Sequence, residues 1–165
     1  ANSAAVMTRP EAHLDMVRPG LMLYGLLPDP QLGGLARLRP VMTLAATVVR
    51  VADLGAGEGI SYGHSYRTQR PSRIATVRCG YADGYPRALS NKGRALVGGR
   101  SAPLVGRVCM DHLMIDVTGM NDVEVGTEAV LWGTEPSVGE LAKAAGTIPY
   151  ELVARVGARV ERHYQ

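Results

Sequence analysis

The sequence contains no phenylalanine and only two lysines, Lys92 and Lys143, among its 165 residues. Its aromatic side chains are therefore Tyr and Trp, which bring a polar tip wherever they pack. No apolar run approaches the roughly 20 residues that a membrane span needs. The first residues, ANSAAVMTRPEAHLD, lack a basic lead before an apolar block and do not begin with Met. We therefore expect neither a membrane span nor a secretory leader, and we expect a fragment or a processed chain.

Charge and cysteine content exclude several function classes. The net charge is +3 and the arginines are scattered without a dense basic run, which disfavours nucleic-acid binding. Cys79 and Cys109 lie far apart, so we expect free thiols in a cytoplasmic protein. No CxxC or HxxxH spacing is present, and we expect no metal site. A content of 46% hydrophobic and 20% charged residues is typical of a globular fold.

The first 40 residues predict a short helix, a strand and a loop. Thr8 can cap a helix over 8–17, with Pro10 in its first turn. Residues 17–28 predict a buried strand interrupted by Pro19 and Gly20. Proline and glycine then indicate a loop or linker over 28–40.

The middle of the chain predicts a mainly β fold. Segments rich in β-branched residues alternate with glycine-rich turns, at 41–54, 73–81, 94–99, 102–117 and 122–133. Gly98-Gly99 predicts a tight hairpin turn. Residues 41–133 are therefore expected to form a compact antiparallel sheet or barrel.

The C-terminal part predicts two short helices and a closing strand. Ser137 and Glu140 have the spacing of a capping box, and Gly146 suits a helix stop. Pro149 can open a second helix over 148–156, and residues 158–164 predict a strand.

Four segments could carry chemistry, and each has a plainer interpretation. The glycine of "RPG" at 18–20 could cradle a phosphate together with Ser3, or could simply end a strand. The loop "CGYADGYPR" at 79–87 places polar groups on a rigid sheet, or its Asp83 only bonds its own backbone. Cys109 and Met110 could be core packing alone.

The segment "SYGHSYR" at 61–67 is the fourth. It places Tyr62 and Tyr66 around Gly63 and His64. In a chain without phenylalanine, one of these phenols could be retained for its O–H group. His64 is more often a satisfied histidine than a base.

Taken in order, six segments resemble alanine racemase, a pyridoxal phosphate enzyme. They are NSAA, VRPGLMLYG, ISYGHSY, GYADGYPR, GRVCMDHLMIDVT and IPYE, and the similarity covers essentially the whole chain. The resemblance implies a (β/α)8 barrel followed by a β-rich domain. Residues 1–40 would be the last barrel segments and a linker, and 41–165 the C-terminal β-rich domain.

The resemblance also implies a pyridoxal 5'-phosphate site. Its phosphate ligands would be Ser3, the backbone of Gly20 and Leu21, and Tyr150. Arg18 would face the pyridine nitrogen. Because arginine keeps its proton in proteins, that nitrogen would stay unprotonated and the ring would be a weaker electron sink.

The remaining site residues would act on the substrate. Tyr62 would be a catalytic base on one face of the α-carbon. The Met110 backbone N–H, with Cys109 beside it, would hold the substrate carboxylate. Tyr81, Arg107 and Ile148 would line the substrate corridor. The resemblance implies a homodimer with shared active sites, because Tyr62, Tyr81, Arg107 and Met110 would reach the partner's site.

The sequence departs from the family in its lysines. Racemisation needs a second base, the lysine that forms the Schiff base, and neither Lys92 nor Lys143 matches it. We therefore expect the isolated chain to be inactive without a barrel domain that carries this lysine.

The leading hypothesis is the C-terminal part of an alanine racemase. It would interconvert L- and D-alanine by two-base proton transfer and supply D-alanine for peptidoglycan. The alternatives are a serine or broad-specificity amino-acid racemase, and a non-catalytic β-domain or dimerisation module.

Overall fold

The computed structural model describes residues 1–164, and the chain divides into two units, Ala1–Thr43 and Leu44–Gln165. The first unit contains one α-helix and three 3-10 helices. Their bounds are α1 Ser3–Thr8, η1 Pro10–Ala12, η2 Leu21–Tyr24 and η3 Pro30–Gly34.

The helix predicted over 8–17 is wrong. Helix α1 begins earlier, where the Asn2 side chain accepts a hydrogen bond from the Ala5 N–H at 3.0 Å, and it ends at Thr8. Only a single 3-10 turn, η1, follows. Pro10 explains the difference, because it has no N–H to donate and its ring collides with the preceding turn of an α-helix.

The strand predicted over 17–28 is also wrong. Residues 21–24 form η2, which ends at Gly25 with φ of 72°. A strand needs a neighbouring strand to satisfy its backbone groups, and the described residues of the first unit contain none. The loop predicted over 28–40 returns the chain to Tyr24, whose carbonyl accepts a hydrogen bond from the Val41 N–H at 3.1 Å.

The second unit is built on a six-stranded antiparallel sheet that confirms the mainly β prediction. Its strands lie in the order β6-β5-β8-β1-β4-β7. A bridge between Leu104 and Ile115, and the Val105 N–H donating to the Met114 carbonyl at 2.9 Å, join the end of β6 to β7. The sheet is thereby nearly closed into a barrel. The strands are β1 Leu44–Leu54, β4 Ser72–Val77, β5 Arg94–Val97, β6 Arg100–Pro103, β7 Leu113–Asp116 and β8 Glu128–Trp132.

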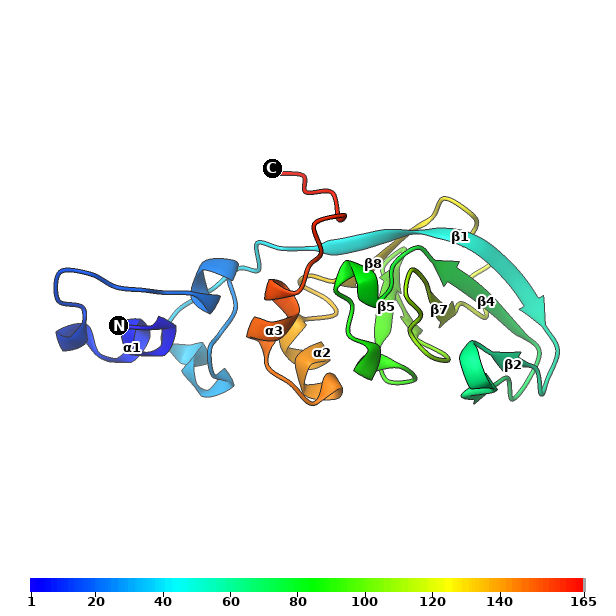
Figure 1. Cartoon of the computed structure of the whole chain (residues 1–165), viewed down its shortest axis with the longest axis horizontal. Helices are drawn as coiled ribbons and strands as arrows, with labels where there is room; N and C mark the ends of the chain where they lie inside the picture. Colours follow the sequence, from blue (N-terminus) through cyan, green and yellow to red (C-terminus); the bar gives the residue numbers. More distant parts are fainter. Residues whose placement is uncertain (165) are drawn as a thin grey trace. The chain divides into compact units, whose positions relative to one another are not determined.

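Strand β1 is the longest element and bends across the barrel (Figure 1). It pairs with β8 through its first half and with β4 through its second half. Register shifts at Leu44/Ala45 and Val48/Arg50 mark bulges, which bend a strand locally. One strand can therefore belong to both halves of the sheet.

Several local predictions are confirmed. Val97 pairs with Arg100 across Gly98 and Gly99, whose φ values of 56° and 76° suit a two-residue hairpin turn. Helix α2, Val138–Ala145, has the predicted Ser137 cap, with the hydroxyl accepting from the Glu140 N–H at 3.1 Å.

The two predicted C-terminal helices are also confirmed, but the predicted capping box is incomplete. Helix α2 ends at Gly146, φ 72°, and α3 spans Pro149–Ala154. Only half of the predicted capping box forms, because the Glu140 carboxylate binds the Arg94 guanidinium at 2.8 and 2.9 Å.

The core of the barrel is apolar. Tyr85 and Trp132 stack inside it with ring centroids 6.1 Å apart. Other fully buried side chains come from the strands and from both C-terminal helices, including Val48, Val77, Val97, Leu113, Ile115, Leu131, Leu141 and Leu152. A small hairpin, β2 Gly59–Ile60 and β3 Tyr66–Arg67, lies beyond the end of β1.

The strand predicted over 158–164 is wrong. The described residues there pair with no strand; they are anchored by the Gly157 N–H, which donates to the Asp83 carbonyl at 3.0 Å, and by the Arg159 side chain. Within residues 1–164, no helix combines the length and hydrophobicity needed to cross a membrane.

Candidate functional site

Tyr62 lies on a strained turn at the tip of the β2–β3 hairpin. Ser61, Gly63 and His64 all have positive φ, of 62°, 67° and 44°. Ser61 also has ψ of −178°, a region that is essentially restricted to glycine. The Tyr62 side chain is 72% exposed. The turn therefore holds the predicted base outside the barrel core.

Two contacts hold this turn against residues 106–109. The Ser61 hydroxyl donates to the Arg107 carbonyl at 2.8 Å, and its oxygen lies 3.5 Å from the Cys109 sulfur. Gly106 permits the approach, since a Cβ on Gly106 would lie 2.8 Å from the Ser61 Cβ. The predicted base and the predicted carboxylate-binding segment are thus directly coupled.

Arg107 places a positive charge beside the same turn. A Cβ built on Gly63 would lie 3.6 Å from the central carbon of the Arg107 guanidinium. Gly63 therefore leaves the arginine fork room to lie against the backbone next to Tyr62. Of the described residues, none forms an ion pair with Arg107 within 4 Å.

The loop that carries Tyr81 docks on the loop that carries Met110. The Tyr81 N–H donates to the Cys109 carbonyl, and the Ala82 N–H donates to the Met110 carbonyl, both at 3.0 Å. A side chain at Gly80 would overlap those two carbonyl groups, so only glycine allows this contact. Tyr81 and Met110 remain 48% and 53% exposed. Backbone bonds hold the two loops together and leave both side chains available.

A hollow of about 610 Å³ lies between the hairpin and the sheet. Tyr62, Gly63, Cys109 and His112 contribute to its lining, together with residues of β1 and β4. Such a volume falls in the range of small-molecule sites.

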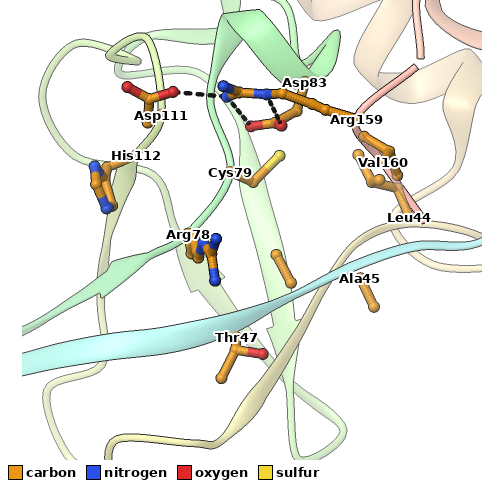
Figure 2. Close-up of a pocket in the computed structure, with 11 residues that line it drawn as sticks. Leu44, Ala45, Thr47, Arg78, Cys79, Asp83, Asp111, His112, Arg159 and Val160 are labelled. Atoms are coloured by element: carbon orange, nitrogen blue, oxygen red, sulfur yellow. Dashed lines mark hydrogen bonds and ion pairs between the residues drawn. The ribbon is translucent and has the colours of Figure 1, made fainter. Parts of the chain in front are cut away.

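A second hollow, of about 440 Å³, contains an ion-paired cluster (Figure 2). Arg159 from the C-terminal segment lies between Asp83 and Asp111. Its guanidinium binds both Asp83 oxygens, at 2.7 and 3.1 Å, and one Asp111 oxygen at 2.7 Å. Partial burial raises the pKa of the Asp83 carboxyl, but hydrogen bonds from Arg159 and the Gly80 N–H outweigh it and leave the pKa below its ordinary value.

The two cysteines differ in environment. Cys79 is buried beneath Asp83, and this burial, with a smaller effect of the Asp83 charge, raises the pKa of its thiol to about 12. Cys79 is therefore a neutral packing group rather than a nucleophile. Cys109 is half-buried beside Ser61.

In the first unit, Ser3 and the turn at Gly20 converge. The buried Ser3 hydroxyl accepts hydrogen bonds from the Gly20 N–H at 2.9 Å and the Met22 N–H at 3.3 Å. A Cβ on Gly20 would meet nothing within 4 Å, so this backbone is open to a ligand. Because the Gly20 and Met22 N–H groups bind the Ser3 oxygen, the hydrogen of that hydroxyl is the group that suits a phosphate here. Arg18 next to this turn has an exposed side chain, while Leu21 is buried.

Two predicted site residues lie apart from Tyr62. Ile148 precedes helix α3, Tyr150 lies within it, and their side chains are 58% and 42% exposed. The β2–β3 hairpin and α3 occupy opposite ends of the second unit (Figure 1). One chain therefore does not bring Tyr62 and Tyr150 together within this unit.

Sequence reasoning missed the Arg159 cluster and the role of Ser61. The sequence does indicate that Asp83 could bond its own backbone, and its carboxylate accepts from the Gly80 N–H at 2.8 Å. Arg159 lies 76 residues from Asp83 and 48 from Asp111, and no local pattern links them.

Comparisons with known families cover nearly the whole chain. The model of the alanine racemase C-terminal domain matches residues 41–164, and that of the alanine racemase N-terminal domain matches residues 1–28. The alanine racemase of Stutzerimonas stutzeri is 48% identical over 99% of this chain, and that of Halothermothrix orenii is 50% identical over 100%. The chain spans 46% and 45% of the length of these two relatives.

Solved structures agree with the sequence relatives. Alanine racemase from Streptomyces coelicolor A3(2) has a TM-score of 0.92 and 46% identity, over 98% of this chain and 44% of its own. Alanine racemase from Bartonella henselae, solved with covalently bound pyridoxal phosphate, also has a TM-score of 0.92, at 35% identity, over 100% of this chain and 46% of its own.

Proposed function

The chain belongs to the alanine racemase family, and we propose that it supplies the C-terminal part of a pyridoxal phosphate-dependent racemase that interconverts L- and D-alanine. The observation that carries the proposal is the coupling of Tyr62 to residues 107–110. The exposed Tyr62 side chain and Cys109 line one hollow, and Arg107, which forms no ion pair within the described residues, lies against Gly63 of the same turn.

The first unit would bind the cofactor phosphate. Ser3 and the Gly20–Leu21 backbone would hold it, with Tyr150 as a further ligand, and Arg18 would face the pyridine nitrogen. When bound, pyridoxal phosphate supplies an electron sink that stabilises negative charge at the substrate α-carbon. The support for this assignment is the turn at Gly20, where the Ser3 hydroxyl binds the backbone and no other atom lies within 4 Å of a Cβ placed on the glycine.

Tyr62 would move the α-proton on one face of the substrate. The strained turn would fix the backbone from which the Tyr62 side chain projects. The Arg107 guanidinium lies against the backbone of the same turn and would place a positive charge beside this site. The Met110 N–H would hold the substrate carboxylate, while Tyr81, Arg107 and Ile148 would line the corridor.

The opposite face needs a second base. Lys92 and Lys143 are both exposed, Lys143 within α2 and Lys92 in the turn after η6, Arg87–Leu89. Neither lies in a hollow that contains Tyr62. We therefore assign the Schiff-base lysine to the remainder of a full-length protein, and we expect no racemisation by these 165 residues alone.

A shared site in a homodimer completes the proposal. Tyr62 and helix α3, which carries Tyr150, lie at opposite ends of the second unit. A single site that uses both tyrosines is then best built from two chains, one providing Tyr62, Tyr81, Arg107 and Met110 and the other providing the cofactor. The two free thiols suit the reducing cytoplasm, where D-alanine would be made for peptidoglycan.

The direct test is Tyr62→Phe in a full-length protein that carries this sequence, with Tyr66→Phe as the matched control in the same hairpin. The ring stays and only the phenol oxygen is lost. We expect α-hydrogen exchange with deuterated solvent to fall by about 100-fold or more for one enantiomer, the scale of general-base catalysis. The visible absorbance of bound cofactor should be unchanged.

Two results would contradict the proposal. A wild-type full-length protein that fails to racemise L-alanine would refute the activity. Equal, small losses for both enantiomers in Tyr62→Phe would refute the role of Tyr62. Turnover of L-serine beside L-alanine distinguishes the broad-specificity alternative.

A further inference from the structure

The Arg159 cluster joins three segments that are remote in sequence. Arg159 belongs to the C-terminal segment, Asp83 to the loop after β4, and Asp111 to the segment before β7. Arg159 forms a two-point contact with Asp83 and a third bond with Asp111, which uses the planar fork of the guanidinium.

This cluster lies close in sequence to the predicted substrate-contacting residues. Asp83 is two residues from Tyr81, and Asp111 adjoins Met110. The Asp83 carboxylate also accepts the Gly80 N–H at 2.8 Å, and the Asp83 carbonyl accepts the Gly157 N–H at 3.0 Å. The C-terminal segment is therefore bound to both the backbone and the side chain of the Tyr81 loop.

An isolated ion pair on the surface would contribute little to stability. Here the Asp83 side chain is only 15% exposed, and one guanidinium neutralises two carboxylates. Without Arg159, Asp83 and Asp111 would be left as neighbouring negative charges on the two loops. Repulsion between them would oppose the hydrogen bonds from the Tyr81 and Ala82 N–H groups to Cys109 and Met110.

We propose that Arg159 is a positioning residue for substrate binding, and that it holds the Tyr81 loop against the Met110 segment through Asp83 and Asp111. The inference rests on the proposed function, because it assigns Tyr81 and Met110 to the substrate corridor and the carboxylate site. Arg159 would not contact the substrate itself. It would act by fixing the separation of the two loops that carry Tyr81 and Met110.

The test compares Arg159→Met with Arg94→Met in the full-length holoenzyme. Arg94 is a matched control, because it also binds one carboxylate at two points, Glu140, and a second, Glu135, at 3.0 Å. Its cluster joins β5 to α2 and includes none of the predicted site residues. Both variants remove the same kind of ion cluster, and only one affects the two loops.

Two readouts are measured. Hydrogen exchange should show faster exchange of the Tyr81 and Ala82 amides in Arg159→Met and not in Arg94→Met. Steady-state kinetics should show kcat/KM for L-alanine falling by about 10- to 100-fold in Arg159→Met, the scale of a misplaced binding group. The fall should lie mainly in KM, because carboxylate binding is shared by ground and transition states. Arg159→Lys should recover part of it, since it retains the charge without the fork.

Unchanged exchange and unchanged KM in Arg159→Met would overturn the inference. So would equal kinetic losses in the two methionine variants, which would indicate general destabilisation. If the wild-type protein does not racemise alanine, the proposed function fails by itself, and the exchange comparison still decides whether Arg159 couples the loops.

Discussion

The strained turn before Tyr62 can be tested by a pair of substitutions at Ser61. Ser61→Ala removes the hydrogen bond to the Arg107 carbonyl and keeps a Cβ in the left-handed region. The lost bond is worth about 1 kcal/mol. Ser61→Gly loses the same bond, but it relieves roughly 1–3 kcal/mol of backbone strain. Against this, the greater freedom of glycine in the unfolded chain costs about 0.5–1 kcal/mol of stability. The glycine variant should therefore be the more stable of the two by about 1 kcal/mol.

Urea denaturation followed by fluorescence of Trp132, the single tryptophan, measures this difference. Ser65 provides the control, because it lies in the same hairpin with an ordinary φ of −68°. There the order should reverse, with alanine more stable than glycine. An alanine variant of Ser61 as stable as the glycine variant would show that the turn stores no strain.

Three further predictions concern the second unit. The Tyr85 hydroxyl is buried without a hydrogen-bond partner in residues 1–164. Tyr85→Phe should therefore raise the free energy of unfolding by about 1 kcal/mol and Tm by about 2–4 °C. A fall in Tm of that size in thermal melts would contradict this and reveal a partner for the hydroxyl. Because the pKa of Cys79 is raised to about 12, iodoacetamide at about pH 8 should label Cys109 and spare Cys79 until the protein unfolds, and equal labelling would contradict this. The pKa of Asp83 is held below 3.8, so its stabilising contribution is present at neutral pH and is lost as the pH falls below about 4 and through the folded-state pKa. Asp83→Asn should flatten that acid limb in denaturation curves at pH 2.5–5, and an unchanged limb would refute the assignment.

Predictions based on short-range chemistry are largely confirmed. Gly98-Gly99 forms its hairpin turn, and Ser137 and Gly146 bound α2, because a turn or a cap depends on a few neighbouring residues. The β-branched segments between 41 and 133 form the antiparallel strands of the second unit.

Two predicted strands are wrong because no partner strand meets them, whereas the helix predicted over 8–17 is wrong for a local reason, Pro10. Residues 17–28 and 158–164 have strand-like composition, and neither pairs with a strand in the described chain. Backbone hydrogen bonds in a sheet come from another segment, so composition alone cannot ensure them. The Glu140 side-chain bond of the capping box does not form either, because the Glu140 carboxylate binds Arg94, which is remote in sequence.

The sequence by itself determined the family and the residues that carry its motifs, since six ordered segments hold Tyr62, Tyr81, Arg107, Met110 and the turn at Gly20. Only the tertiary structure decided how those residues are supported. It placed Ser61 in a glycine-like conformation against the Arg107 carbonyl, and it brought Arg159 from 76 residues away onto Asp83. The physical reason is that a motif specifies side-chain chemistry locally, while the contacts that hold a side chain in place form between segments that become neighbours only when the barrel closes.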